Sequence, residues 1–187
     1  MKKMRAGRLT MAAIIVLGMV IWQGGKMWPV VVSAGGDVRE QLAGEWSLAS
    51  RVTTLRDGKV LEDRGLGTVP HGVLIYDRLG HVAAQLSRAG RTVEMLSGEC
   101  GELEKIRGTE DTAQTVLGYD AYFGTYTIDE KAGVVTHHLE GAIFPGDVGK
   151  NIRRNFVLAG DTLTITFDTT AREGLAVTRK LVWTRLK

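Results

Sequence analysis

The sequence predicts a mainly β protein: a closed antiparallel up-and-down barrel of about eight or nine strands with one capping helix, preceded by an N-terminal apolar export segment. Three observations predict it. Residues 44–187 divide into short apolar runs separated by turn residues. One stretch, 109–119, has helical instead of alternating spacing, and residues 9–22 form an apolar run behind a basic N-terminus. A chain of 187 residues is long enough for one domain and too short for two ordinary ones.

The N-terminus has the layout of a secretory signal, with basic residues before an apolar core and small residues at 32–34 where a peptidase would cut. An uncleaved anchor is the second alternative, with membrane association through 9–28. Both predict an exported protein, periplasmic, secreted or anchored. A later translation start, at Met11 or Met27, is the third. The basic residues before the apolar core are Lys2, Lys3, Arg5 and Arg8.

Charge separates the signal or anchor, 1–34, from the predicted barrel domain, 42–187. Residues 1–34 hold five basic and no acidic residues, so the remainder carries 19 basic and 21 acidic residues, a net charge of −2. The sequence pI of about 9.1 therefore reflects the leader, and no nucleic-acid partner is predicted. The single cysteine, Cys100, excludes an internal disulfide, and with no histidine beside it in sequence we assign it no nucleophilic role.

The first predicted strand, 44–54, alternates in side-chain character, and Asp57-Gly58 predicts a hairpin that returns through 59–62. Continuous alternation would place Trp46, Leu48, Ser50 and Val52 on one face and Glu45, Ser47 and Arg51 on the other.

Two strands, 71–76 and 81–86, follow around a turn at 77–80. Residues 87–107 lack a clear period and predict a long loop or a lid. The helix 109–119 then begins at Thr109, a suitable N-cap residue, and its apolar stripe is expected to cover one opening of the barrel.

The C-terminal part resumes as strands joined by short turns. Residues Leu163, Ile165 and Phe167 alternate with threonines, which indicates one apolar face. A meander this long must protect its edges, and closure into a barrel removes them. An eight-stranded barrel is either filled by side chains or holds one small ligand. The predicted strands here are 121–128, 134–144, 152–158, 162–167 and 177–186.

Gly44 and Trp46 open the first strand, and Arg185 closes the last. This pattern resembles the structural signature of the lipocalins and the wider calycin group. The resemblance implies that Trp46 plugs the closed end of the barrel and that Arg185 packs over its ring, with Arg179 as the alternative arginine.

The chain also resembles the bacterial and fungal lipocalin-like domain family over roughly residues 42–185. The resemblance implies the fold and little about chemistry. Four stretches carry it, at 42–48, 72–76, 119–126 and 135–145.

The most suggestive candidate site surrounds His137 and His138. Alternation places His137 toward the barrel interior, where it could orient a ligand or act as a general acid, and His138 and Glu140 toward the other face. A purely structural role, with one histidine hydrogen-bonded inside and one exposed, is the alternative. Adjacent histidines on a strand diverge, so no metal or cofactor is predicted. The candidate ligand-binding residues are Tyr76, Tyr122, Tyr126, His137, His138 and Glu140.

Three functions remain open. The first is the binding of a small hydrophobic or amphipathic molecule in the barrel interior. The second is an isomerase or cyclase using His137 or a tyrosine as the acid. The third is a filled barrel acting as an envelope interaction domain. A phosphate loop, a serine elbow and a Cys-x-x-Cys pair are absent from the sequence, which favours binding over catalysis. The pair Arg153–Arg154 is expected to be solvated, or else to meet an anionic group at the open end.

Overall fold

The chain forms two compact units, Met1–Val30 and Val31–Lys187. In the first unit, strands β1 (Val20–Gln23) and β2 (Lys26–Pro29) pair antiparallel. Within the residues that the structure describes, no helix is both long enough and apolar enough to cross a bilayer. The computed structural model describes residues 20–23, 26–29, 37–63, 65–90, 118–171 and 174–187.

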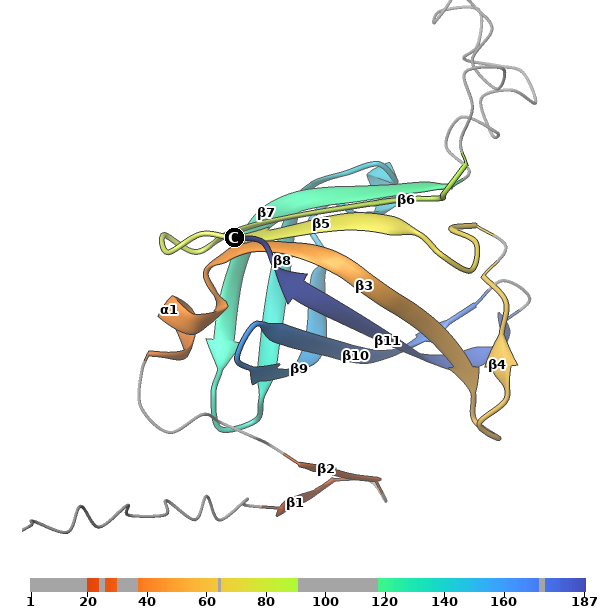
Figure 1. Cartoon of the computed structure of the whole chain (residues 1–187), viewed down its shortest axis with the longest axis horizontal. Coiled ribbons are helices and arrows are strands. Elements are labelled where there is room, and N and C mark those ends of the chain that lie inside the picture. Colours follow the sequence, from red (N-terminus) through yellow and green to blue (C-terminus); the bar gives the residue numbers. More distant parts are fainter. Residues whose placement is uncertain (1–19, 24–25, 30–36, 64, 91–117, 172–173) are drawn as a thin grey trace, which may run out of the picture. The chain divides into compact units, whose positions relative to one another are not determined.

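The second unit is a closed antiparallel barrel of eight strands (Figure 1), which confirms the predicted fold class. Each strand pairs with the next one along the chain, and β11 pairs with β3 to close the ring. A short extra strand, β4 (Val60–Leu61), pairs with β3 near its end. The barrel strands are β3 (Gly44–Leu55), β5 (His71–Tyr76), β6 (His81–Ser87), β7 (Tyr119–Asp129), β8 (Val134–Ala142), β9 (Asn151–Ala159), β10 (Thr162–Thr170) and β11 (Ala176–Arg185).

Alternating apolar residues fill the lower interior of the barrel. On β10, Leu163 and Ile165 are buried while Thr162 is exposed, as the period of two requires. Burying one such aliphatic side chain stabilises the fold by about 1.5–3 kcal/mol. Strands on all sides of the barrel contribute side chains to this core. Among these side chains are Leu74, Val82, Leu158, Leu181 and Trp183.

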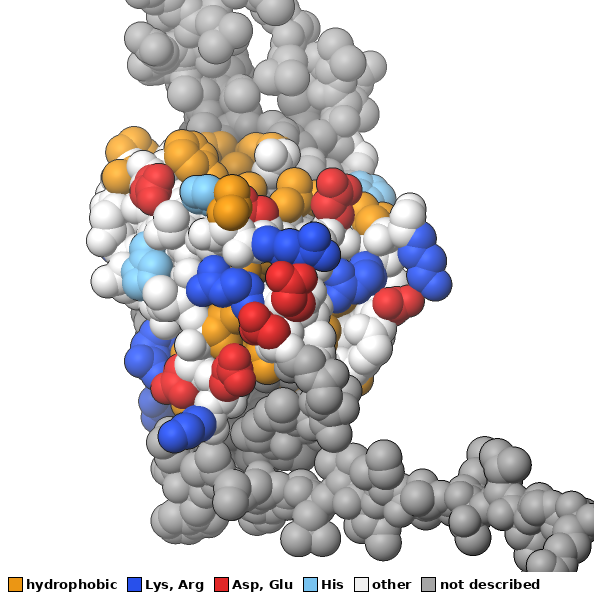
Figure 2. Space-filling model, turned by 90° about the vertical axis from the view of Figure 1, so that its left-hand side faces the viewer, with side chains coloured by type: hydrophobic (Ala, Val, Ile, Leu, Met, Phe, Trp, Pro, Cys, Tyr) orange, Lys and Arg blue, Asp and Glu red, His pale blue; other side chains and the backbone are white. Residues whose placement is uncertain are grey.

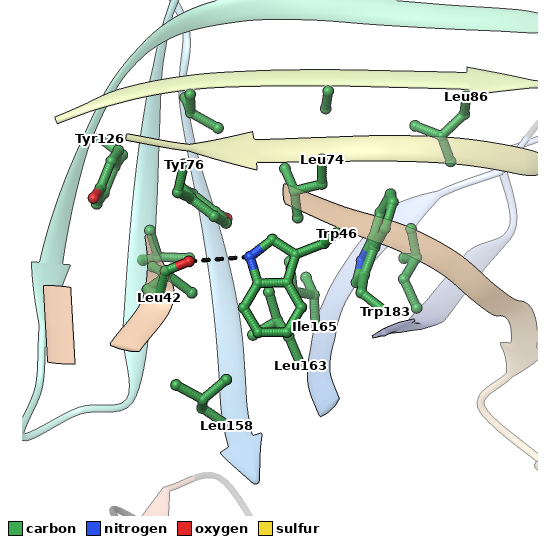
Figure 3. Packing of buried hydrophobic residues seen from close by; sticks show 14 of the residues in the cluster. Leu42, Trp46, Leu74, Tyr76, Leu86, Tyr126, Leu158, Leu163, Ile165 and Trp183 are labelled. Atoms are coloured by element: carbon green, nitrogen blue, oxygen red, sulfur yellow. Dashed lines mark hydrogen bonds between the residues drawn. The ribbon is translucent and has the colours of Figure 1, made fainter. Parts of the chain in front are cut away.

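A short helix, α1 (Val38–Leu42), closes one end of the barrel. Its first turn is capped by Asp37, whose carboxylate accepts a hydrogen bond from the backbone N–H of Arg39 at 2.8 Å. Leu42 is fully buried, and its carbonyl accepts a hydrogen bond from Nε1 of Trp46 at 3.0 Å (Figure 3). The buried indole of Trp46 therefore has its polar atom satisfied and forms the floor of the barrel.

The guanidinium of Arg185 lies 4.0 Å from the centroid of the Trp46 ring, the arrangement that the lipocalin resemblance implies. It also donates hydrogen bonds to the carbonyls of Ala43, at 2.8 Å, and Gln41. Gly44 makes room for this arginine, because a Cβ there would lie 2.5 Å from Nη1 of Arg185. Its φ of 137° also favours glycine. Arg185 thus connects the end of β11 to the start of β3 and to the end of α1.

Charged side chains of both signs are interspersed on the outer surface at the α1 end (Figure 2). Arg78 and Glu40 form an ion pair at 2.8 Å, and Lys187 and Asp161 form another at 3.3 Å. Exposed pairs of this kind contribute little to stability. The closed end is therefore defined by the Trp46 floor and not by its surface charges.

A β-bulge in β3 reverses which side chains of its second half point into the barrel, compared with the prediction. Leu48 pairs with Trp183 and Ser50 pairs with Val182, so Ala49 is an extra residue on β3. One inserted residue reverses the side-chain alternation beyond it. Arg51, expected outside, therefore points inward with its side chain 7% exposed, while Val52, expected inside, is 38% exposed.

All nine strands predicted for residues 44–186 are present, with boundaries that shift by a few residues. Most of the loop 87–107 and of the helix 109–119 lies outside the described residues, as does Cys100. Of the helix, only Gly118 and Tyr119 are described: Gly118 lies in a turn, and Tyr119 begins β7.

Candidate functional site

A cavity of about 590 Å³ lies inside the barrel above the Trp46 floor. This volume falls in the range of pockets that enclose small molecules. Among its lining residues, Lys150, Asn151 and Asp168 are exposed, which marks the side where the cavity reaches solvent. Its apolar lining consists of Leu74, Ala84, Leu86, Leu139, Ile152, Ile165, Phe167, Leu181 and Trp183.

Polar side chains from five strands enter the same cavity. The tyrosine and the histidine come from β7 and β8, and the arginines come from β3, β9 and β11. The cavity therefore combines the nine apolar lining residues with a larger set of polar and charged ones. In small-molecule pockets such polar groups fix the orientation of the ligand. The inward polar lining residues are Arg51, Asp120, Tyr122, His137, Arg154 and Arg179.

His137 is held between two tyrosines. Its Nε2 lies 2.6 Å from the hydroxyl of Tyr76, and its Nδ1 lies 2.9 Å from the hydroxyl of Tyr122. The side chain is 1% exposed, so both ring nitrogens exchange water for a tyrosine partner. Tyr76 also packs edge-on against Tyr126, with ring centroids 4.9 Å apart. The ring of His137 is therefore fixed in orientation.

A second β-bulge fits β7 against β8 at this point. Gly124 pairs with Leu139 and Phe123 pairs with Gly141, which leaves Glu140 as the extra residue. A Cβ on Gly124 would lie 1.9 Å from the carbonyl oxygen of His138, so only glycine permits this approach.

Burial, followed by the positive charge of Arg154, lowers the pKa of His137 to about 3. The imidazole is therefore neutral at pH 7 and has one N–H donor and one acceptor. Burial also raises the pKa of Tyr76 well above its usual value and that of Tyr122 to about 12. Both phenols remain protonated at any physiological pH.

The hydrogen-bond network assigns the histidine tautomer. Within the described part of the chain, the hydroxyl of Tyr76 has His137 as its acceptor and no other. A buried donor without an acceptor is costly, so Tyr76 donates to Nε2 and the proton of His137 sits on Nδ1. That N–H then donates to the oxygen of Tyr122. The hydroxyl proton of Tyr122 is left to point into the cavity that this residue lines.

Three consecutive strands, β9, β10 and β11, continue the wall beyond β8 and bring two arginines together around an aromatic ring. The guanidinium carbon of Arg154 on β9 lies 3.7 Å from the centroid of Phe167 on β10. Phe167 in turn pairs with Arg179 on β11. Burial lowers the pKa of both arginines. A guanidinium nevertheless keeps its positive charge in proteins.

Carboxylates offset this charge incompletely. Asp63 forms an ion pair with Arg51 and also accepts the backbone N–H groups of Gly65 and Leu66, both at 2.9 Å. Burial tends to raise the pKa of Asp63, but its hydrogen bonds outweigh burial and lower the pKa. Asp120 is different: burial raises its pKa even though three arginines act in the opposite direction.

Two donors that line the cavity are buried and unpaired. Nε of Arg179 and Nε1 of Trp183 have no hydrogen-bond partner among the residues that the structure describes. Oγ1 of Thr53, the β3 register partner of Arg179, shares this property. Buried polar groups are nearly always paired, so unpaired donors facing a cavity indicate where an acceptor would bind.

The structure joins Tyr76, Tyr122 and His137 by hydrogen bonds, and Tyr126 packs against Tyr76 without lining the cavity. Tyr126 lies near the floor and donates to the carbonyl of Asp77 at 2.7 Å. The remaining two, His138 and Glu140, do not line the cavity. In the described ranges no three His, Cys, Asp or Glu side chains are close enough to hold a metal ion.

His138 lies on the outer face of β8 because neighbouring residues on a strand point to opposite sides. There its Nδ1 lies 2.7 Å from Oδ1 of Asn151, and its Nε2 lies 3.0 Å from Oγ1 of Thr127. Glu140, the extra residue of the bulge, is exposed. Neither side chain can reach a ligand inside the barrel.

Sequence reasoning missed the inward arginines and Asp120. The pair Arg153–Arg154 was expected to be solvated, or else to meet an anionic group at the open end; of the two residues, only Arg153 is exposed. A usable signal was present, because Arg179 is in phase with the buried Val177 and Leu181 of its strand. Alternation alone would have placed it inside.

Comparison with known proteins agrees with this architecture. A family model described as a lipocalin-like domain matches residues 43–186. No curated protein matches the chain. The match covers most of the chain and includes the Trp46 floor, every barrel strand and the cavity. The resemblance predicted from the sequence is thus confirmed, and the chain belongs to the lipocalin-like domain family.

Proposed function

We propose that the protein binds a small amphipathic molecule inside the barrel. The observation that carries this proposal is the cavity of about 590 Å³ lined by apolar side chains and by the unpaired donors of Arg179 and Trp183. A barrel built only for stability would gain from filling such a space, because a cavity forfeits packing contacts. A ligand with apolar bulk and acceptor atoms would restore both.

Binding is favoured over acid catalysis by the state of His137. A general acid works best when its pKa lies near the working pH, and the pKa of His137 is about 3. Both nitrogens are also occupied by Tyr76 and Tyr122. The triad therefore acts as a fixed polar anchor, and it presents the Tyr122 hydroxyl to the ligand.

The same proposal places the barrel outside the cytoplasm, in the periplasm, secreted or held at the membrane. Its support is the order of a basic N-terminus, the apolar run 9–22 and the small residues 32–34. Extraction of the native protein from cell fractions, with mass spectrometry of its N-terminus, distinguishes a cleaved from an anchored form. Recovery of the whole chain in the cytoplasm would contradict export.

Retinol and retinoic acid are suitable probes, since each has an extended apolar skeleton and quenches tryptophan emission when bound near Trp183. The full chain is expected to bind at least one of them saturably at 1:1. Replacing Ala84, which lines the cavity, by Phe should weaken binding about 10-fold or more because the new ring occupies ligand space. The matched control Ala83→Phe lies on the outer face of the same strand.

Three results bear on the proposal. Saturable binding that Ala84→Phe weakens and Ala83→Phe leaves intact supports an interior site. Binding that both variants leave unchanged places the probe on the outer surface and overturns the proposal. Failure of both retinoids to bind overturns it as well.

A further inference from the structure

We propose that the occupant of the barrel is a monoanionic amphipath whose carboxylate lies between Arg154 and Arg179 and accepts the Tyr122 hydroxyl. This inference rests on the proposed function and specifies the ligand class. Its apolar portion would extend toward Leu74, Ile165, Leu181 and Trp183.

The count of buried charges points to an anion. Three guanidiniums enter the interior, from Arg51, Arg154 and Arg179, and two carboxylates accompany them, from Asp63 and Asp120. One positive charge is therefore left without a counter-charge among these groups. Buried charges are expected to be paired, and a single negative charge on the ligand completes the set. A dianion would leave one negative charge unbalanced, and a cationic ligand would increase the excess of positive charge.

The two aspartates are not equally available as partners. Asp63 is committed to Arg51 and to the backbone N–H groups of Gly65 and Leu66. Asp120 lines the cavity but forms no ion pair within the described ranges. Arg154 and Arg179 thus lack a direct carboxylate contact there, and a guanidinium offers paired N–H donors that match a carboxylate in geometry.

Phe167 sets the two arginines in position. The ring of Phe167 stacks on the Arg154 guanidinium at 3.7 Å and pairs across the sheet with Arg179. Contact with the ring uses a face of the Arg154 guanidinium and leaves its N–H groups as donors, of which one on Nη1 reaches the carbonyl oxygen of Arg153 at 3.2 Å. The positive charge of Arg154 also acts on Tyr122, where it opposes the effect of burial on the pKa, so the arginine wall is coupled to the Tyr76–His137–Tyr122 triad.

The polar groups without partners here are donors. Nε of Arg179 is an unpaired N–H group, and Tyr122 presents a hydroxyl proton. A carboxylate has only acceptor atoms and can take several of these donors at once. An alcohol at the same place would bring a proton of its own and no charge, so it would satisfy the site less well.

Retinoic acid and retinol test this inference, because they share one skeleton and differ in the charge of the end group. The unmodified full chain is expected to bind retinoic acid about 10-fold or more tighter than retinol at pH 7.5, since charged hydrogen bonds are the stronger class. This ratio needs no substitution and is measured by quenching of tryptophan emission.

Two variants locate the anion. Arg179→Gln and, separately, Arg154→Gln should each weaken retinoic acid about 10-fold and change retinol by less than about 2-fold. Lys180→Gln is the matched control: it removes one positive charge from the neighbouring, exposed position of the same strand and should change neither affinity. Circular dichroism verifies that each variant is folded.

The outcomes separate the two proposals. Equal affinity for the acid and the alcohol, or arginine variants that weaken both alike, would overturn the anionic ligand and leave interior binding intact. Loss of retinoic acid binding in Lys180→Gln to the same extent as in Arg179→Gln would also overturn it, because a general surface charge would then be responsible. Failure of both retinoids to bind the unmodified chain would overturn the proposed function itself.

Discussion

Acidification is expected to destabilise the barrel through His137 in a calculable way. In the unfolded chain this histidine has its ordinary pKa of 6.5, whereas in the fold its pKa is about 3. Between these two pKa values the histidine is protonated in the unfolded state and neutral in the folded state. The stabilisation is complete above pH 6.5 and is lost progressively as the pH falls toward 3. Each pH unit in that window costs about 1.4 kcal/mol.

Between pH 7 and pH 4.5 the loss from this one residue amounts to about 2.5 kcal/mol. Because the folded-state pKa lies well below 4.5, the loss over this window is governed by the unfolded-state pKa. For a domain of this size, 2.5 kcal/mol is a substantial share of a total stability of about 5–15 kcal/mol.

Urea unfolding at pH 7 and pH 4.5 measures this loss for the wild type and for His137→Gln. The glutamine cannot take up a proton, so the variant should lose about 2.5 kcal/mol less stability than the wild type over the same interval. Carboxylates such as Asp63 also destabilise the fold on acidification, but they do so in both proteins and cancel in the difference. His138→Gln is the matched control, since it keeps the buried His137.

An equal loss in the wild type and in His137→Gln would refute the reasoning. It would mean that His137 is protonated equally in the folded and unfolded states. Water or a counter-charge would then have to reach the ring, and the triad would not be the rigid neutral anchor described above. A reduced pH dependence in His138→Gln would refute it equally, because the outer histidine would then be the responsible group.

Two further substitutions test how the barrel is built. Gly124→Ala puts a Cβ 1.9 Å from the carbonyl oxygen of His138 and should lower the unfolding free energy by about 3 kcal/mol or more, whereas Gly146→Ala, with open space around it, should be nearly neutral in the same urea assay. Arg185→Gln removes the cation over Trp46 and charged hydrogen bonds at the floor, and should cost about 2–4 kcal/mol, with red-shifted tryptophan emission as water enters. A variant of Arg185 as stable as the wild type would show that the floor needs only packing.

Local sequence patterns were sufficient to predict the strands and the closed barrel. The alternation of Leu163 and Ile165 with threonines depends only on the pleat of one strand, and the turn residues mark each reversal. The Trp46–Arg185 contact joins residues at the two ends of the domain, yet the resemblance of both ends to the lipocalins sufficed to predict it. Features that repeat along one strand or within one family are thus accessible from sequence.

The candidate site was only partly accessible because it depends on register between strands. The histidine and Tyr76 are 61 residues apart, and their hydrogen bond requires that β5, β6, β7 and β8 pair in one specific alignment. The inward face of β8 could be predicted, and with it His137, but not which tyrosines reach its ring. Tyr126 shares the face of Tyr122 and differs only in lying closer to the floor.

The bulges account for what alternation could not show. An unbroken β3 would keep Arg51 on the outer surface, as its sequence suggests, and the interior would then hold two arginines and Asp120. The insertion of Ala49 turns Arg51 inward, and its ion pair with Asp63 attaches the loop after β4 to the barrel wall. Trp46 and Leu48 precede the insertion, so they keep their inward orientation and form part of the floor and the core. One extra residue therefore divides β3 into a half whose inward side chains, Trp46 and Leu48, are apolar and a half from which Arg51 enters the site.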